Sequence, residues 1–199
     1  MITVSQHLIL KIQTRRILMT NENKTHKLVL TALMACLGTV AILMFRIPIP
    51  GDQGIIHLGD SVIFLAVLIL GTKHAVPAAA IGHSMANVLG GLMMWAPWTF
   101  VIKGTMALIA GAFITHMLKN GENYSTFKRT TIKITGMMLG GIFMIAGYYV
   151  AGGIMFGNWI VALVGIPWNI GQLIIGIMIA ITLAAALCKT PARNYFKFQ

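Results

Sequence analysis

The feature that most constrains this fold is a run from Ile134 to Leu187 that contains no Asp, Glu, Lys or Arg. The run is too long for one membrane-spanning helix, which needs about 20 apolar residues, and it suits two such helices joined by a loop. Glycine and proline near Gly157 and Pro167 mark the break between them. We therefore predict one span that ends near Phe156 and another from about Ile166 to Leu187.

The composition of the whole chain agrees with a membrane protein. Its 199 residues are 57% hydrophobic and only 10% charged, whereas soluble domains are about 25% charged. We predict an all-α integral membrane protein with six transmembrane helices in contact with lipid, the first four at about 28–45, 58–71, 75–93 and 99–118. They would form one membrane domain over residues 28–188, between tails of residues 1–27 and 189–199. A start at Met19 would give a more ordinary protein, so we expect residues 1–18 to be dispensable.

The basic residues indicate how the spans are oriented. Thirteen of the 15 Lys and Arg residues fall in the two tails, the turn between spans two and three, and the loop between spans four and five. The opposite side holds only Arg46, and Lys103 falls within a span. Because positive charge marks the cytoplasmic side, we predict that both termini are cytoplasmic. No continuous basic face could follow a phosphate backbone, so the formal charge of +11 does not indicate a nucleic-acid partner.

Polar and aromatic side chains gather toward the predicted outer side. A charged residue within a span, such as Lys103, is costly unless it faces a cavity or a partner, and tryptophan and tyrosine rings stack on planar compounds. We predict an outward-facing pocket for a small planar neutral or acidic compound, beneath the non-helical, proline-containing loop Arg46–Ile56. The predicted substrate-binding residues are His57, Asn87, Trp95, Trp98, Lys103, Tyr148, Asn158, Trp159, Asn169 and Gln172.

Structural interpretations of these side chains stay open. Lys103 could extend to the nearby membrane surface, and the tryptophans could belong to an interfacial belt. Asp60, in the first turn of span two, could serve the unpaired N–H groups of that helix or contact the ligand. His83 could be a hydrogen-bonded core residue or a ligand contact.

Small residues predict close packing of two helices. Ala78, Gly82, Ala86 and Gly90 recur every four residues, so we expect their helix to be tightly packed inside the bundle. Span one carries a second face of small residues, which serves either internal packing or the docking of another subunit. The candidate docking residues are Thr31, Ala32, Ala35 and Cys36.

The sequence gives little support for catalysis or metal binding. Cys36 and Cys188 lie in separate apolar runs near opposite ends of the chain, which does not indicate a disulfide framework. We find no metal-ligand spacing and expect no metal or other cofactor. The chain also lacks a GxxxxGK[ST] phosphate loop and the HExxH and GxSxG motifs, so we expect a protein that is not an enzyme.

Four sequence elements carry a resemblance to a known family. They are the small-residue face of span one, HLGD at 57–60, GTKHAVPAAAIGHSMANVLGG at 71–91 and WAPWTFVIKG at 95–104. From Leu28 to about Leu187 the chain resembles the substrate-binding (S) components of energy-coupling factor (ECF) vitamin transporters. It is most similar to their branch for hydroxymethylpyrimidine, pyridoxine and riboflavin-like compounds.

The resemblance implies an S-component bundle that binds a vitamin with high affinity at its outer side. It also implies docking through span one onto a transmembrane coupling subunit that carries two ABC-type ATPases, which alone hydrolyse ATP. Hydroxymethylpyrimidine or pyridoxine is the expected substrate, with pantothenate and riboflavin also open, and the expected location is the cell membrane of a prokaryote. The alternative is a stand-alone ion-coupled carrier, which usually needs an intramembrane acid or an inverted repeat.

Overall fold

The computed structural model describes the backbone of residues 4–48, 55–119 and 124–190, with side chains described from residue 24 onward. Helices make up nearly all of the described part, and a single two-stranded sheet accompanies them. The elements in chain order are α1 (Val4–Met44), β1 (Arg46–Pro48), β2 (Ile55–His57), α2 (Gly59–Leu70), α3 (Thr72–Leu89), the 3₁₀ helix η1 (Met93–Trp95), α4 (Ala96–Leu118), α5 (Thr126–Phe156), α6 (Trp159–Leu163) and α7 (Gly165–Leu187).

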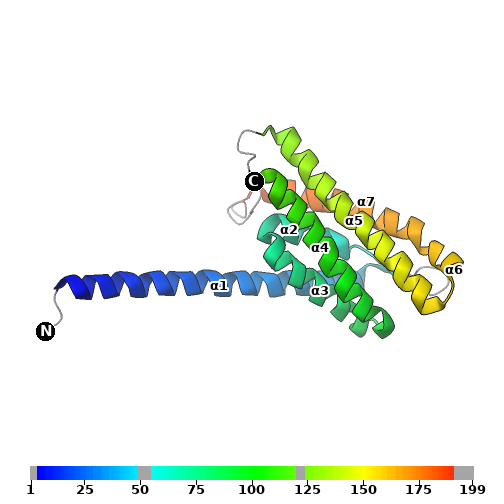
Figure 1. Ribbon diagram of the computed structural model, residues 1–199, viewed down its shortest axis with the longest axis horizontal. Coiled ribbons are helices and arrows are strands. Elements are labelled where there is room, and N and C mark those ends of the chain that lie inside the picture. The colour runs from blue at the N-terminus through cyan, green and yellow to red at the C-terminus, as the bar shows by residue number, and fades with distance from the viewer. Residues whose placement is uncertain (1–3, 49–54, 120–123, 191–199) are drawn as a thin grey trace.

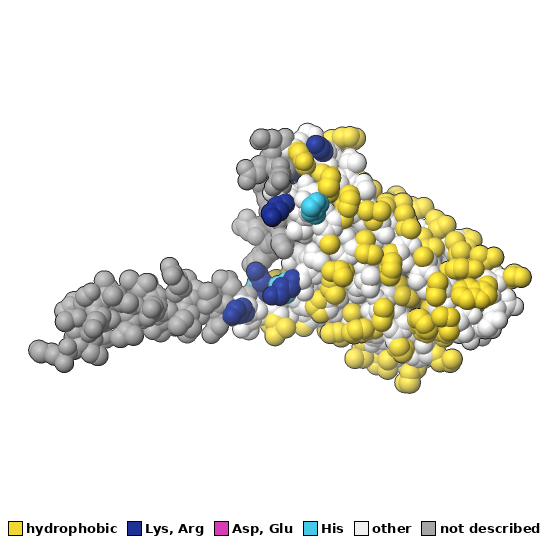
Figure 2. Space-filling view, in the orientation of Figure 1, with side chains coloured by type: hydrophobic (Ala, Val, Ile, Leu, Met, Phe, Trp, Pro, Cys, Tyr) yellow, Lys and Arg dark blue, Asp and Glu magenta, His cyan; other side chains and the backbone are white. Residues whose placement is uncertain are grey.

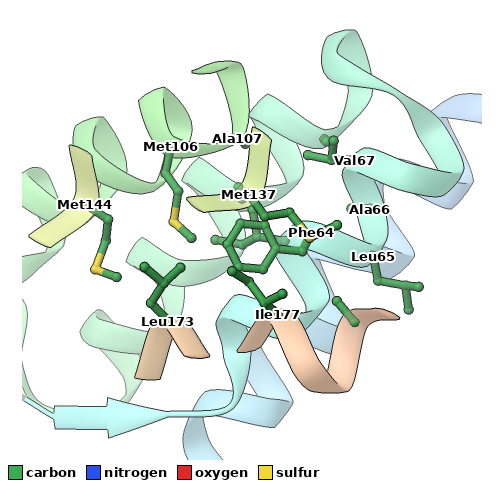
Figure 3. Close-up of a cluster of buried hydrophobic side chains, with 14 of the residues drawn as sticks. Phe64, Leu65, Ala66, Val67, Met106, Ala107, Met137, Met144, Leu173 and Ile177 are labelled. Atoms are coloured by element: carbon green, nitrogen blue, oxygen red, sulfur yellow. The ribbon is translucent and has the colours of Figure 1, made fainter. Parts of the chain in front are cut away.

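Helix α2 lies at the centre of the bundle and packs against α1, α3, α4 and α7. Its residues from Gly59 to Ile69 are all buried, as expected for a helix that is apolar on every side. Phe64 lies among Met106 and Met137 in the main hydrophobic cluster, and Leu173 and Ile177 of α7 close the cluster from the other side (Figure 3). The bounds of this helix agree with those of the predicted second span, residues 58–71, but with 12 residues it is shorter than the helices long enough to cross a membrane.

Four helical segments of the described part are long and apolar enough to cross a membrane: Lys24–Met44, Met93–Leu118, Thr126–Phe156 and Trp159–Leu187. Hydrophobic side chains cover much of the surface of the bundle, whereas Lys and Arg gather at the end from which α1 extends (Figure 2). The chain is therefore an integral membrane protein. At 1.5 Å per residue α2 is only about 18 Å long, and the longer helices surround it.

Helix α1 begins far ahead of the predicted first span. It starts at Val4 rather than near Leu28, and its N-terminal part extends well beyond the other helices (Figure 1). No glycine or proline precedes Gly38 in the sequence, so the polar stretch before Leu28 contains nothing that stops a helix. Composition marked that stretch as outside the membrane but did not determine its conformation.

The loop predicted at Arg46–Ile56 contains a short antiparallel sheet. Arg46 pairs with His57, and Pro48 pairs with Ile55. Two strands of only three residues carry a weak sequence signal. Pro48 weakens it further, because proline has no N–H to donate and is found in sheets mainly at strand ends and edges. Residues 49–54 lie outside the described part of the chain. The sheet lies beside the first residues of α2 and so places β2 close to Asp60.

The glycine stripe of α3 packs directly on α1, as predicted. A Cβ atom at Gly82 would overlap the backbone carbonyl of Ala35. The Thr39 hydroxyl donates a hydrogen bond to the carbonyl of Gly82 at 2.8 Å. Ala78 and Ala86 of the same stripe are also buried, so the two helices approach as closely as small residues allow.

We predict that Gly82→Ala lowers the free energy of unfolding by about 1–3 kcal/mol, because the added methyl group has no room against the backbone of α1. Gly171→Ala in α7 is the matched control, since a Cβ there meets nothing within 4 Å and alanine is the better helix former. Thermal unfolding of the two variants in detergent micelles measures the difference. Equal midpoints would contradict the described approach of α1 to α3.

Candidate functional site

A buried ion pair joins α2 to α4. The Lys103 ammonium donates to Asp60 Oδ1 at 2.6 Å, and both side chains are 0% exposed. Lys103 lies two turns into α4, about 10 Å from its first residue, and it does not extend to the membrane surface. The structure thus excludes the interfacial interpretation of Lys103, and Asp60 gives this cation the partner that a charge inside a membrane protein requires.

Gln172 of α7 and His57 of β2 extend the ion pair into a network. The Gln172 side-chain amide donates from Nε2 to Asp60 Oδ2 at 2.8 Å. Its Oε1 accepts the backbone N–H of His57 at 3.0 Å. The network therefore connects the sheet to three helices through buried side chains. We call Asp60, Lys103, Gln172 and His57 the polar network.

The imidazoles of His57 and His83 also lie next to Asp60, but neither forms a hydrogen bond with its carboxylate in the described part of the chain. His57 Nδ1 accepts the backbone N–H of Gly59 at 3.2 Å, and burial lowers the pKa of this imidazole to about 4 despite the nearby carboxylate, so His57 is neutral near pH 7. His83 Nε2 is 3.8 Å from Asp60 Oδ1. Both ring nitrogens of His83 are buried without a hydrogen-bond partner within the described part of the chain, so the hydrogen-bonded core role considered for it is not formed there.

His57, Asp60 and His83 could in principle hold a metal ion, because each offers a ligand atom within 4.8 Å of the others. Both oxygens of Asp60 are already engaged, however, one by Lys103 and one by Gln172. A divalent ion would also lie beside the Lys103 ammonium at low dielectric, where like charges repel strongly. The arrangement fits an ion-pair network better than a metal centre.

A second polar chain runs beside the network through Tyr148. Asn87 Nδ2 donates to Thr99 Oγ1 at 2.6 Å, and Thr99 Oγ1 lies 3.1 Å from the Tyr148 hydroxyl. The Lys103 ammonium is 5.3 Å from the centroid of the Tyr148 ring, within the range of a cation–π contact. Tyr148 thus connects the ion pair to Asn87 at the end of α3.

A cavity of 610 Å³ opens at the end of the bundle where α3 ends and α4 begins. This volume is in the range of small-molecule sites. The ring of Trp95 lies in its wall, 5.9 Å from the ring centroid of Tyr148 and 6.1 Å from that of Phe156. The sheet contributes Arg46, Pro48 and Ile55, the turn after α3 contributes Gly90 to Met94, and α5 contributes Met155 and Phe156.

The structure brings together six of the ten predicted site residues. His57, Lys103 and Gln172 meet in the polar network, and Trp95, Tyr148 and Asn87 form the adjoining chain of contacts. Of the ten, only Trp95 is among the described residues that line the cavity. Sequence reasoning gave no site role to Thr99, Arg46, Met155 or Phe156. The pairing of Asp60 with Lys103 was also missed, although a cation inside a span should have prompted a search for its anion.

The other four predicted residues have different surroundings. Trp98 is half-buried against the hydrophobic core, and Asn169 is buried at the start of α7. Asn158 is exposed and caps α6, where its Oδ1 accepts the N–H of Ile160 at 3.0 Å. Trp159 is 49% exposed and its ring lies 5.6 Å from that of Tyr149.

The four candidate docking residues fall on two sides of α1. Thr31 is buried and donates to the carbonyl of Lys27 at 2.7 Å, while Ala35 faces Gly82 of α3. Ala32 and Cys36 are exposed. Of the four candidates, Ala32 and Cys36 are therefore the two whose side chains another protein could contact.

Comparison with known proteins places these features in a family. Residues 22–189 match the family model described as "ECF-type riboflavin transporter, S component". The chain is 29% identical over 181 residues to the thiamine precursor transporter HmpT of Lactococcus lactis subsp. cremoris (strain MG1363), covering 90% of this chain and 98% of the relative. It is also 35% identical over 119 residues, 60% of this chain and 73% of the relative, to an uncharacterised protein from a gap 3′ region of Pyrococcus woesei.

We predict that Lys103→Met destabilises the fold by about 3–5 kcal/mol, because it leaves the Asp60 carboxylate buried without its cation. The double variant Asp60→Asn, Lys103→Met should recover much of this loss, since it removes both charges. Lys119→Met, at the exposed end of α4, serves as the control. Unfolding in detergent measures these three variants and Asp60→Asn alone, and a double variant as unstable as the sum of its two single substitutions would contradict the pairing.

Proposed function

Because the chain belongs to the family of ECF-type riboflavin transporter S components, we propose that it is the high-affinity substrate-binding subunit of an ECF-type importer. The observation that carries this proposal is the cavity of 610 Å³ beside Trp95. Its substrate is a small water-soluble vitamin or vitamin precursor. The relative named as a thiamine precursor transporter favours hydroxymethylpyrimidine, with pyridoxine next and pantothenate or riboflavin further possibilities.

The wall of the cavity suits a planar ring. Trp95 is 6% exposed and is held by Tyr148 and Phe156, so it presents a fixed aromatic surface on which a heterocycle can stack. In this proposal Trp95 contacts the ligand directly, whereas Lys103, Gln172 and His57 fix the position of the surrounding wall. Asn87 and Tyr148 connect these two parts of the site.

The importer also needs partners that supply energy. The sequence contains no GxxxxGK[ST] phosphate loop, so in this proposal ATP is hydrolysed by two ABC-type ATPases attached to a transmembrane coupling subunit. The exposed Ala32 and Cys36 form the face of α1 that docks on that subunit. Thr31 and Ala35 support the same helix from within the bundle. The chain itself is not catalytic and uses no cofactor.

The proposed topology has six spans, with α2 and α3 as two of them and residues 28–188 as the membrane domain. The basic end of the bundle, including Lys73 and Lys119, faces the cytoplasm together with both termini. The cavity then opens on the opposite side, where a nutrient arrives. This orientation fits a multi-pass protein of a prokaryotic plasma membrane.

A stand-alone ion-coupled carrier is the second candidate, and one observation favours it. Asp60 is an acid buried inside the bundle, which is the kind of residue that such carriers use to couple transport to an ion. Purified protein reconstituted in liposomes without ATPases distinguishes the two functions. Uptake driven by a proton or sodium gradient would support the carrier, whereas uptake only with the complete ATPase complex supports the S component.

We predict that Trp95→Ala weakens the binding of hydroxymethylpyrimidine by about 1–3 kcal/mol, because the ligand loses its stacking surface. Trp168→Ala is the control, since Trp168 is 42% exposed at the start of α7 and is not among the cavity residues. Isothermal titration calorimetry on detergent-solubilised protein measures both affinities. An unchanged affinity in the Trp95 variant would remove this ring from the site.

We predict that Ala32→Leu abolishes ATP-driven uptake and leaves ligand affinity unchanged, because a bulky side chain prevents close approach of a partner helix. Leu37→Met, a conservative change at an exposed residue about 100° around the same helix from Cys36, should transport normally. Ala35→Leu should instead disturb the packing of α1 on α3. Uptake by the reconstituted complex, with calorimetry on each variant, separates these effects. Normal uptake in Ala32→Leu would place the docking face elsewhere.

A further inference from the structure

We propose that Arg46 is the specificity-determining residue of the cavity and selects planar ligands that carry an anionic oxygen group, a carboxylate or a phosphate. The proposal rests on the function proposed above and adds a charge preference to it: because hydroxymethylpyrimidine itself is neutral, an acidic or phosphorylated relative of such a ring should bind more tightly than the neutral ring. In the sequence, Arg46 stands out only as the single basic residue on the predicted outer side.

The position of the guanidinium is fixed by the end of α3. Nη1 of Arg46 donates to the carbonyl oxygen of Gly90 at 3.1 Å, and Gly90 follows the last residue of that helix. A Cβ atom at Gly90 would lie only 2.9 Å from Nη1, so the glycine leaves room for the guanidinium. Carbonyl groups at a helix C-terminus also attract a cation. Arg46 is exposed, and this hydrogen bond holds one edge of its guanidinium at the cavity.

Arg46 gives the described lining of the cavity a positive charge. Among the described residues that line it, Arg46 is the only one with a formal charge, and its neighbours include Trp95, Met155 and Phe156. Lys103 does not offset or reinforce this charge, because Asp60 neutralises it inside the bundle. A guanidinium has five N–H donors in a planar fork, and one of them accounts for Gly90. The remaining donors match the two oxygens of a carboxylate or phosphate group.

The location of Arg46 in the sequence supports a role in binding. Topology requires basic residues on the cytoplasmic side, and thirteen of the 15 Lys and Arg residues fall in the segments assigned to that side. A cation at the opposite end does not help to orient the chain. Arg46 lines the cavity, so a role in ligand binding explains its position.

Pairs of planar compounds, each an anion and its neutral relative, test the proposal on the full chain in detergent. The pairs are nicotinate and nicotinamide, 4-aminobenzoate and 4-aminobenzamide, and hydroxymethylpyrimidine monophosphate and hydroxymethylpyrimidine. For at least one pair, the wild-type chain should bind the anion about tenfold more tightly than the neutral compound, the effect of one charge-assisted hydrogen bond. In Arg46→Gln this ratio should fall to about one, and Arg46→Lys should keep part of it. Calorimetry gives each affinity.

Lys73→Gln is the control, because Lys73 is an exposed cation at the start of α3, at the other end of the bundle, and its removal should leave the ratio unchanged. An equal preference in wild type and Arg46→Gln overturns the proposal, as does the absence of any preference in wild type. Failure of all six compounds to bind the folded chain at millimolar concentration overturns it as well. Preference for an acid without any binding of hydroxymethylpyrimidine would refute the proposed substrate alone, and binding of hydroxymethylpyrimidine with equal affinities within all three pairs would refute the role of Arg46 alone.

Discussion

The ion pair of Asp60 and Lys103 is the interaction on which the packing of α2, α4 and α7 depends. Both charges are fully buried, and neither could remain so without the other, since an unpaired charge in the interior is very unfavourable. Gln172 uses its donor on the carboxylate and its acceptor on the backbone of His57. One carboxylate thereby positions α4 and α7, which are distant in sequence, against α2 and the adjoining β2.

The same pair determines which charge a ligand can meet. The sequence presents Lys103 as the cation of the predicted pocket, but Asp60 neutralises it inside the helices. Lys103 therefore helps to position the ring of Tyr148, which in turn packs against Trp95 in the wall of the cavity. Among the described residues that line the cavity, the formal charge comes instead from Arg46 of β1, which donates to the carbonyl of Gly90 at the end of α3. Lys103 thus stabilises the packing inside the bundle, whereas Arg46 is the cation at the cavity.

The sequence predicts the helices well and the pairing between them poorly. Apolar runs located α2, α4 and α7 within a few residues, and the spacing of Gly82 predicted close packing that the backbone of Ala35 confirms. The strands at Arg46–Pro48 and Ile55–His57 were missed because so short a sheet depends on its neighbours rather than on local propensity. Asn158 and Trp159 were predicted at the same membrane depth as Trp95, yet they lie at the exposed start of α6. Composition predicts depth in a membrane, but it does not predict which side of a helix faces a cavity.

Helix α1 shows why spacing alone leaves such a question open. Thr31 with Ala35, and Ala32 with Cys36, have the same four-residue spacing and lie on adjacent stripes of one helix, about 100° apart. The first stripe meets α3, where Gly82 leaves room only for the backbone of Ala35, and the second is exposed. Small residues on the inner stripe are needed for the chain's own packing, so their size says nothing about a partner. Small residues on the outer stripe have no such internal requirement, and it is there that close approach by another helix has physical meaning.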